Sequence, residues 1–227
     1  MSVRSIIAEM KSEADPEAVE GMARFGISSK NTLGLSMPTL RSMAKRIGKD
    51  HETARGLWES GIHEARILAS LVDEPAKVTE EQMEKWVSQF DSWDVCDQCC
   101  GTLFDKTPFA YTKALEWSRR KEEFVKRAGY VLMAELAVHD KGAPDKAFLR
   151  FLPEIERGST DSRNFVKKAV NWALRQIGKR NMKLNGESQK LAKSISAIDN
   201  PSAKWVAADA LRELRSEGVQ KKLRRSS

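Results

Sequence analysis

The sequence predicts an all-helical protein. Apolar residues recur at spacings of three and four along most of the chain, as they do in 164–178, and this spacing places them on one face of a helix. The seven prolines mostly stand at expected helix starts or turns and divide the chain into helix-sized pieces. No segment alternates apolar and polar residues over the length of a strand, so no sheet is expected.

The chain is long enough, with 227 residues of which 41% are hydrophobic, to bury a core as one domain or as a continuous stack of repeats. No Gly/Ser-rich linker separates two halves. We therefore expect a single repeat domain over 1–218, followed by a basic tail over 219–227 that frays.

Two features of the sequence predict a cytoplasmic protein. The apolar runs are short and interrupted by charge, and the N-terminal residues lack the pattern of a secretory signal, so neither a membrane span nor secretion is expected. The three cysteines, Cys96, Cys99 and Cys100, are an odd number that cannot all pair within the chain, which is typical of reduced thiols.

The charge balance is basic. Lys and Arg number 39 against 32 Asp and Glu, which gives a formal net charge of +7. Such an excess favours a polyanionic partner if it gathers on one surface, whereas a well-solvated charged exterior is the alternative.

A short pattern recurs about every 40 residues. The segments 124–128 (FVKRA), 165–169 (FVKKA) and 205–209 (WVAAD) each begin with an aromatic residue and Val, and each leads into a Leu-containing helical segment. This spacing is typical of HEAT or armadillo helix pairs, which stack because one pair cannot bury its own apolar face. We predict an α-α superhelix of HEAT-like repeats whose concave face suits an extended partner.

Cations recur at corresponding places in the second helix of each expected repeat. They are Arg66, Lys126, Arg127, Lys167, Lys168 and Arg175. If those helices line the concave face, the cations form a basic stripe of the kind that follows a phosphate backbone. The alternative is that they only solvate the outer faces of helices.

An aromatic residue and a carboxylate stand together at one expected helix start. Trp93 and Asp97 are four residues apart and share a face, while Ser92 or Asp91 is expected to cap the helix. An aromatic ring beside a carboxylate suits recognition of a sugar and stabilisation of developing positive charge. Trp93 and Trp172 can equally be core residues. We assign the remaining ones to packing: Trp58, Trp86, Trp117 and Trp205.

No motif indicates a cofactor or a metal. Cys96 and Cys99 have C-x-x-C spacing, but no second pair exists and the three histidines are scattered, so a zinc site is not expected. The sequence also lacks a Gly-rich phosphate loop and the H-E-x-x-H and G-x-S-x-G motifs, and Gly178 followed by two cations is typical of a helix C-terminus.

At these residues the chain resembles the AlkD-like DNA alkylation repair family, HEAT-like-repeat DNA glycosylases that remove positively charged N3- or N7-alkylated purines. The resemblance covers nearly the whole chain. It rests on the segments 22–25, 33–38, 92–97, 124–128 and 165–175.

The resemblance implies a role for each matched residue. Asp97 matches the catalytic carboxylate, Trp93 and Trp172 match an aromatic pair that packs against the sugar-phosphate backbone, and Arg127 matches a phosphate-contacting arginine. We expect Lys126, Lys167, Lys168 and Arg175 to contact DNA as well. The implied partner is double-stranded DNA containing alkylated bases, bound by a cofactor-independent monomer with no obligate protein partner.

Two positions depart from the family's catalytic branch. Phe25 stands where that branch commonly has Tyr, and Ser92 stands where it has a second Trp. The alternative function is therefore a non-catalytic HEAT-repeat module that binds damaged or branched DNA. A protein-binding scaffold is a third class, which predicts an apolar concave face and no salt-sensitive DNA affinity.

Overall fold

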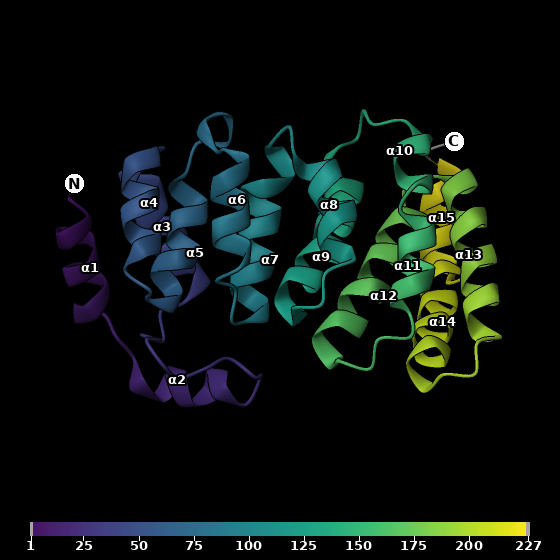
Figure 1. The fold of residues 1–227 in the computed structure, drawn as a ribbon, viewed down its shortest axis with the longest axis horizontal. Helices are drawn as coiled ribbons and strands as arrows, with labels where there is room; N and C mark the ends of the chain where they lie inside the picture. Colours follow the sequence, from purple (N-terminus) through teal and green to yellow (C-terminus); the bar gives the residue numbers. More distant parts are fainter. Residues whose placement is uncertain (1, 226–227) are drawn as a thin grey trace. The chain divides into compact units, whose positions relative to one another are not determined.

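The computed structural model describes residues 2–225, and every regular element in that range is a helix (Figure 1). The prediction of an all-α fold is confirmed. Residue contacts divide the described chain into two compact units between Thr107 and Pro108, here named the N-terminal and the C-terminal unit. The single repeat domain expected over 1–218 stays a prediction.

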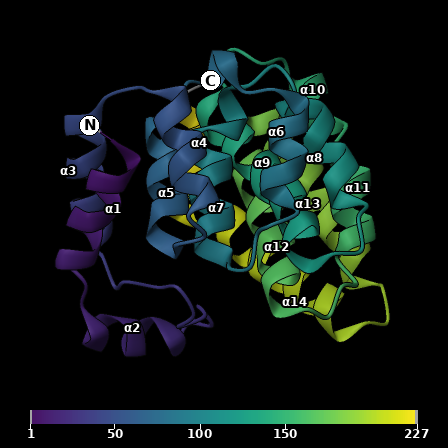
Figure 2. The same cartoon turned by 60° about the vertical axis from the view of Figure 1, so that its left-hand side comes forward.

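The N-terminal unit is built around α5, which packs against α3, α4 and α7. Aromatic rings form part of its core. Trp58 and Trp86 are stacked with ring centroids 4.0 Å apart, and both are buried. Their assignment to packing is confirmed. Two views show α2 lying crosswise beneath the other helices of this unit (Figure 2). The helices are α1 (Val3–Ser12), α2 (Pro16–Ala23), α3 (Met37–Ile47), α4 (His51–Glu59), α5 (His63–Val72), α6 (Glu80–Val87) and α7 (Trp93–Thr102), with short 3-10 turns at Pro75–Lys77 and Phe104–Lys106.

A buried carboxylate fixes the loop between α2 and α3. Glu64 of α5 accepts hydrogen bonds from the backbone N–H groups of Leu33, Gly34 and Leu35. Gly34 has φ of 82°, and a Cβ at this position would stand 2.2 Å from the carbonyl oxygen of Asp15. Only glycine fits this loop, which joins α2 to the rest of the unit.

The C-terminal unit is built around α9 and α12, which pack against each other. α8 also packs on α9, and the two approach so closely that a Cβ on Gly129 would lie 2.3 Å from the backbone nitrogen of Ser118. α14 packs against α12 and α13. The helices are α8 (Ala110–Ser118), α9 (Glu123–His139), α10 (Asp145–Leu149), α11 (Leu152–Gly158), α12 (Asn164–Gly178), α13 (Met182–Ser196), α14 (Pro201–Leu214) and α15 (Glu217–Arg225).

The recurring pattern of the sequence marks equivalent helices. Two copies begin at the second residue of α9 and of α12, the third lies about one turn into α14, and the rings of Phe124 and Phe165 are 5.6 Å apart. Contacts between these helices repeat at a fixed offset of 38 residues: Arg127 donates to the carbonyl oxygen of Phe165, and Asn171 donates to the carboxylate of Asp209. The repeat predicted from the sequence is therefore the packing repeat of this unit.

The chain end is helical, its fraying stays a prediction, and one tryptophan differs from expectation. Residues 219–225, expected to fray, lie within α15, where Leu223 is buried; residues 226–227 lie outside the described residues. Trp117 is buried as assigned, but Trp205 is 41% exposed, so its assignment to packing is wrong. None of the helices within residues 2–225 has the length and apolar character needed to cross a membrane.

Candidate nucleic-acid interface

The start of α7 carries Trp93 and Asp97 on one side of the helix. Trp93 is the first helical residue, Asp97 follows one turn later, and both side chains are partly exposed. Helix α7 thus begins where the sequence predicts, and it presents an indole and a carboxylate together at the protein surface.

The cap residue of α7 is one of the two expected, but its side chain makes no capping bond. Ser92 occupies the cap position, but its side chain accepts no hydrogen bond from the helix and instead donates a 2.7 Å bond to Asp94. The same Asp94 carboxyl group accepts from the backbone N–H of Val95 and lies 2.8 Å from Nε2 of His63. Ser92 thus stands at the cap position that the sequence predicts, but the side chain that accepts from a backbone N–H of the first turn is that of Asp94.

The buried His63 of α5 and the partly exposed Asp94 of α7 form an ion pair. Burial acts to lower the pKa of His63, but the hydrogen bond and the charge of Asp94 outweigh it and the pKa is raised. Burial likewise acts to raise the pKa of Asp94, and His63 and Ser92 outweigh it so that the pKa is lowered. Sequence reasoning missed this pair, since the two residues are 31 positions apart and no motif links them.

The indole of Trp93 is held by the chain that follows α2. Its Nε1 donates a 3.0 Å hydrogen bond to the carbonyl oxygen of Phe25, whose own side chain is 71% exposed. The acceptor is a backbone atom, so the bond does not depend on which side chain stands at position 25. The bond orients Trp93 while the Phe25 ring faces solvent.

Arg127 and Lys126 lie in the first turns of α9 and have protein partners. Arg127 is buried, and its Nη1 donates a 2.6 Å hydrogen bond to the carbonyl oxygen of Phe165. Lys126 Nζ lies 3.1 Å from the carboxylate of Asp161. Burial acts to raise the pKa of Asp161, but hydrogen bonds from Arg163 and Lys126 outweigh it and lower the pKa to about 2.

Helix α12 carries the other four predicted residues of this unit. Lys168, Trp172 and Arg175 follow one another at spacings of four and three, which places them on one side of the helix. Lys168 is exposed and Trp172 is partly exposed. Arg175 is ion-paired with Glu213 of α14. Lys167 lies outside this row, with its Nζ 5.0 Å from the ring centre of Trp205.

Arg66, the earliest member of the expected stripe, faces inward. Its Nη1 donates to the carbonyl oxygen of Gln89 and lies 3.5 Å from Asp91, and its guanidinium stands 5.5 Å from the ring centre of Trp58. Arg66 therefore fixes the segment before α7. Of the stripe's cations, Lys168 has the most exposed setting, and a concave basic face stays a prediction.

The cysteines of α7 are buried thiols. Burial raises the pKa of Cys99 and of Cys100, so both thiols are neutral near pH 7. Among residues 2–225, His, Cys, Asp and Glu nowhere gather in a group of three or more that is suited to a metal ion.

Comparison with solved structures defines the class of protein. One structure matches with a TM-score of 0.77 at 19% sequence identity, covering 100% of this chain and 95% of its own. It is described as belonging to a new family of proteins related to the HEAT-like repeat DNA glycosylases with affinity for branched DNA structures. The fold is therefore that of the HEAT-like repeat proteins.

Comparison with protein families gives the particular family. The model of the DNA alkylation repair enzyme family matches residues 6–216, so the chain belongs to that family. It is 24% identical to the uncharacterized protein Lin0241 of Listeria innocua, over 84% of this chain and 93% of that protein. It is 23% identical to the uncharacterized protein Lmo0209 of Listeria monocytogenes, over 84% of each chain.

Proposed function

We propose that the protein is a cofactor-independent DNA glycosylase that excises positively charged N3- and N7-alkylated purines from double-stranded DNA. The observation that carries the proposal is the pairing of Trp93 and Asp97 on one partly exposed side of α7, in a chain of the DNA alkylation repair family. Asp97 is the proposed catalytic carboxylate.

The proposed chemistry needs few protein groups. The bond between C1′ of the deoxyribose and the purine nitrogen breaks, and its electron pair goes to the purine, whose positive charge is thereby neutralised. The sugar acquires oxocarbenium character, which the Asp97 carboxylate stabilises electrostatically and the indole face of Trp93 stabilises by a cation–π interaction. Water attacks C1′ and gives up one proton, which Asp97 accepts and passes to solvent.

The C-terminal unit supplies the proposed backbone contacts. The row of Lys168, Trp172 and Arg175 on α12 suits a sugar-phosphate strand, because an indole packs on the sugar while cations meet the phosphates. Arg127 is the proposed phosphate clamp, with Lys126 and Lys167 as further contacts. We propose that the protein acts as a monomer without a partner chain, and the cytoplasmic location stays a prediction.

Release of free base tests the enzymatic proposal. A duplex with a single N7-methylguanine is incubated with the protein, and the released base is measured against a no-enzyme control and an unmodified duplex. Release that depends on both the lesion and the protein is expected. Absence of release from N7-methylguanine and from N3-methyladenine duplexes, with the protein folded, contradicts the glycosylase assignment.

A second candidate is a non-catalytic module that binds damaged or branched DNA. The observation that favours it is the similarity in fold to a structure described as having affinity for branched DNA structures. The two candidates separate in one binding experiment with a four-way junction, a linear duplex and a methylated duplex of equal length. Preference for the junction without any base release supports the second candidate, whereas base release supports the first.

A further inference from the structure

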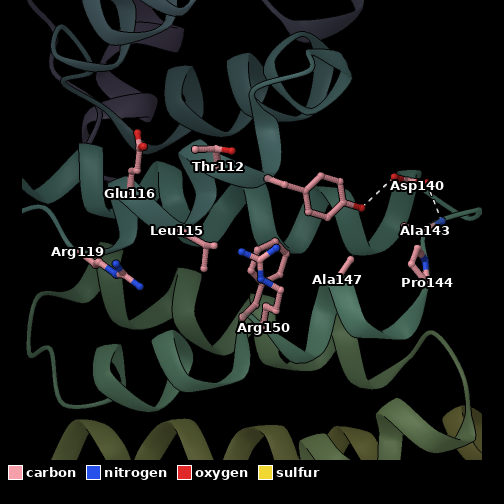
Figure 3. Close-up of a pocket in the computed structure, with 11 residues that line it drawn as sticks. Thr112, Leu115, Glu116, Arg119, Asp140, Ala143, Pro144, Ala147 and Arg150 are labelled. Atoms are coloured by element: carbon pink, nitrogen blue, oxygen red, sulfur yellow. Dashed lines mark hydrogen bonds between the residues drawn. The ribbon is translucent and has the colours of Figure 1, made fainter.

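A pocket of about 570 Å³ opens in the C-terminal unit between α8 and the chain from Asp140 to Phe151, which includes α10 (Figure 3). Its size lies in the range of small-molecule sites. None of the residues proposed to contact DNA lines it. The pocket therefore needs an explanation of its own.

One wall of the pocket is aromatic. The partly exposed ring of Tyr111 stacks on Phe151 with centroids 5.9 Å apart and meets Phe148 edge-on at 6.3 Å, and both phenylalanines are buried. Leu115 and Ala147 add apolar surface beside these rings. This wall suits the flat apolar body of a ligand.

The carboxylates at the pocket already have partners. Asp140 accepts a 2.9 Å hydrogen bond from the hydroxyl of Tyr111 and a 3.0 Å bond from the backbone N–H of Ala143 (Figure 3). Glu116 is ion-paired with Lys113 at 2.8 Å. Both carboxylates are therefore hydrogen-bonded or ion-paired within the protein, and neither needs a cationic ligand as a partner.

The lining also holds two cations, Arg119 and Arg150. Arg119 shares the carboxylate of Glu154 with Arg157, so two guanidinium groups face one negative charge. Arg150 lines the pocket and is exposed to solvent, and its guanidinium has neither a hydrogen-bond acceptor nor an acidic partner within residues 2–225. Of the two cations that line the pocket, Arg150 is thus the one with no acidic side-chain partner, and it is open to pairing with an anionic ligand.

We propose that the pocket binds a small organic acid with a flat apolar body. The ring system of the ligand packs on Tyr111, Leu115 and Ala147, and its carboxylate pairs with Arg150 through a charge-assisted hydrogen bond. This site is independent of the proposed action on DNA, since it uses none of the same residues.

Two matched probes test the charge requirement. The ¹⁵N-labelled full chain is titrated with 2-naphthoate and with 2-naphthamide, which share the ring system and differ in charge, and amide chemical shifts are followed by NMR. We expect shifts confined to residues 111–119 and 140–151, with naphthoate binding about tenfold tighter, as one charge-assisted hydrogen bond supplies. Equal affinity for the two probes, shifts centred elsewhere, or no binding of either overturns the proposal.

Substitutions locate the charge. In Arg150→Gln, naphthoate affinity falls about tenfold to that of naphthamide, while naphthamide affinity is unchanged. Lys146→Gln removes an exposed cation from α10 that does not line the pocket, and it leaves both affinities unchanged. Ala147→Trp fills the pocket and abolishes binding of both probes. If Lys146→Gln and Arg150→Gln weaken naphthoate binding equally, the pocket is not a specific site for the carboxylate. If Ala147→Trp fails to fold, the comparison of the other two variants tests the proposal.

Discussion

Trp93 Nε1 donates a 3.0 Å hydrogen bond to the backbone carbonyl oxygen of Phe25, which joins the start of α7 to the chain that follows α2. The bond depends on the indole N–H and not on the side chain at position 25. Phe25, which carries the most exposed large apolar side chain of the described residues, is thus bonded through its backbone to the residue proposed to contact the sugar.

The two ends of this bond respond differently to substitution. Trp93→Phe removes the donor and is expected to lower the free energy of unfolding by about 1 kcal/mol. Phe25→Ala keeps the acceptor and removes an exposed ring, so a change within about 0.5 kcal/mol is expected. Urea unfolding of both variants measures this, and an equal loss in both would show that the Phe25 ring, rather than the carbonyl, holds Trp93.

The His63–Asp94 pair makes stability depend on pH. The pKa of His63 is raised above its ordinary value of 6.5, so its contribution is complete below pH 6.5 and is lost as the pH rises through the raised pKa. The pKa of Asp94 is lowered below 3.8, so its contribution is complete above pH 3.8 and is lost as the pH falls through the lowered pKa. The pair therefore stabilises most between pH 3.8 and pH 6.5.

His63→Gln tests this dependence. The difference in unfolding free energy between the wild type and His63→Gln is expected to be larger at a pH of about 5.5 than at about 9, because the imidazolium is lost only in the wild type. Chemical denaturation at the two values measures it. A difference that stays constant across this range is evidence against a protonated His63 in the folded protein.

Gly34 combines a positive φ with a steric limit. Gly34→Ala is expected to lower the free energy of unfolding by about 3 kcal/mol or more. The new Cβ would clash with the carbonyl oxygen of Asp15, and the positive φ is itself unfavourable for alanine. Gly61→Ala is the matched control, since φ is 66° there and no atom lies within 4 Å of the new Cβ. That control is expected to cost about 1–2 kcal/mol. If thermal unfolding shows the same loss of stability in Gly34→Ala and Gly61→Ala, the close approach to Asp15 does not contribute.

Lys168 offers a clean test of the proposed backbone contacts. Lys168→Gln is expected to reduce the slope of log K against log salt for duplex DNA by about 0.9, the value for one lost phosphate contact, without a change in stability. Lys190→Gln on α13 removes an equally exposed lysine and is expected to leave the slope unchanged. A smaller slope in the control as well would indicate diffuse attraction to the whole surface.

The sequence alone predicts the helices and their repeat well, because both follow from local spacing. The copies beginning at Phe124 and Phe165 pack ring against ring, and α7 begins at Trp93 as expected. These features depend on residues close together in the chain, where periodicity and turn residues act directly.

The hydrogen-bond and ion-pair partners of the candidate residues could not be predicted from local spacing in the sequence. Trp93 bonds to a carbonyl 68 residues away, and every residue has a carbonyl, so no side-chain pattern marks Phe25. Likewise, the sequence predicts that Arg175 faces solvent, but in the structure it forms an ion pair with Glu213 on α14 of the next repeat. Such contacts depend on how helices pack, which single-chain periodicity does not specify.

The central proposal is that Asp97 drives base excision, and single-turnover release of N7-methylguanine tests it most directly. Wild type is compared with Asp97→Asn and with Asp91→Asn, which removes an exposed carboxylate from the segment before α7. The account predicts that Asp97→Asn lowers the rate about 100-fold or more with DNA affinity retained, while Asp91→Asn stays near the wild-type rate. Full activity in Asp97→Asn contradicts the account and removes this carboxylate from the chemistry.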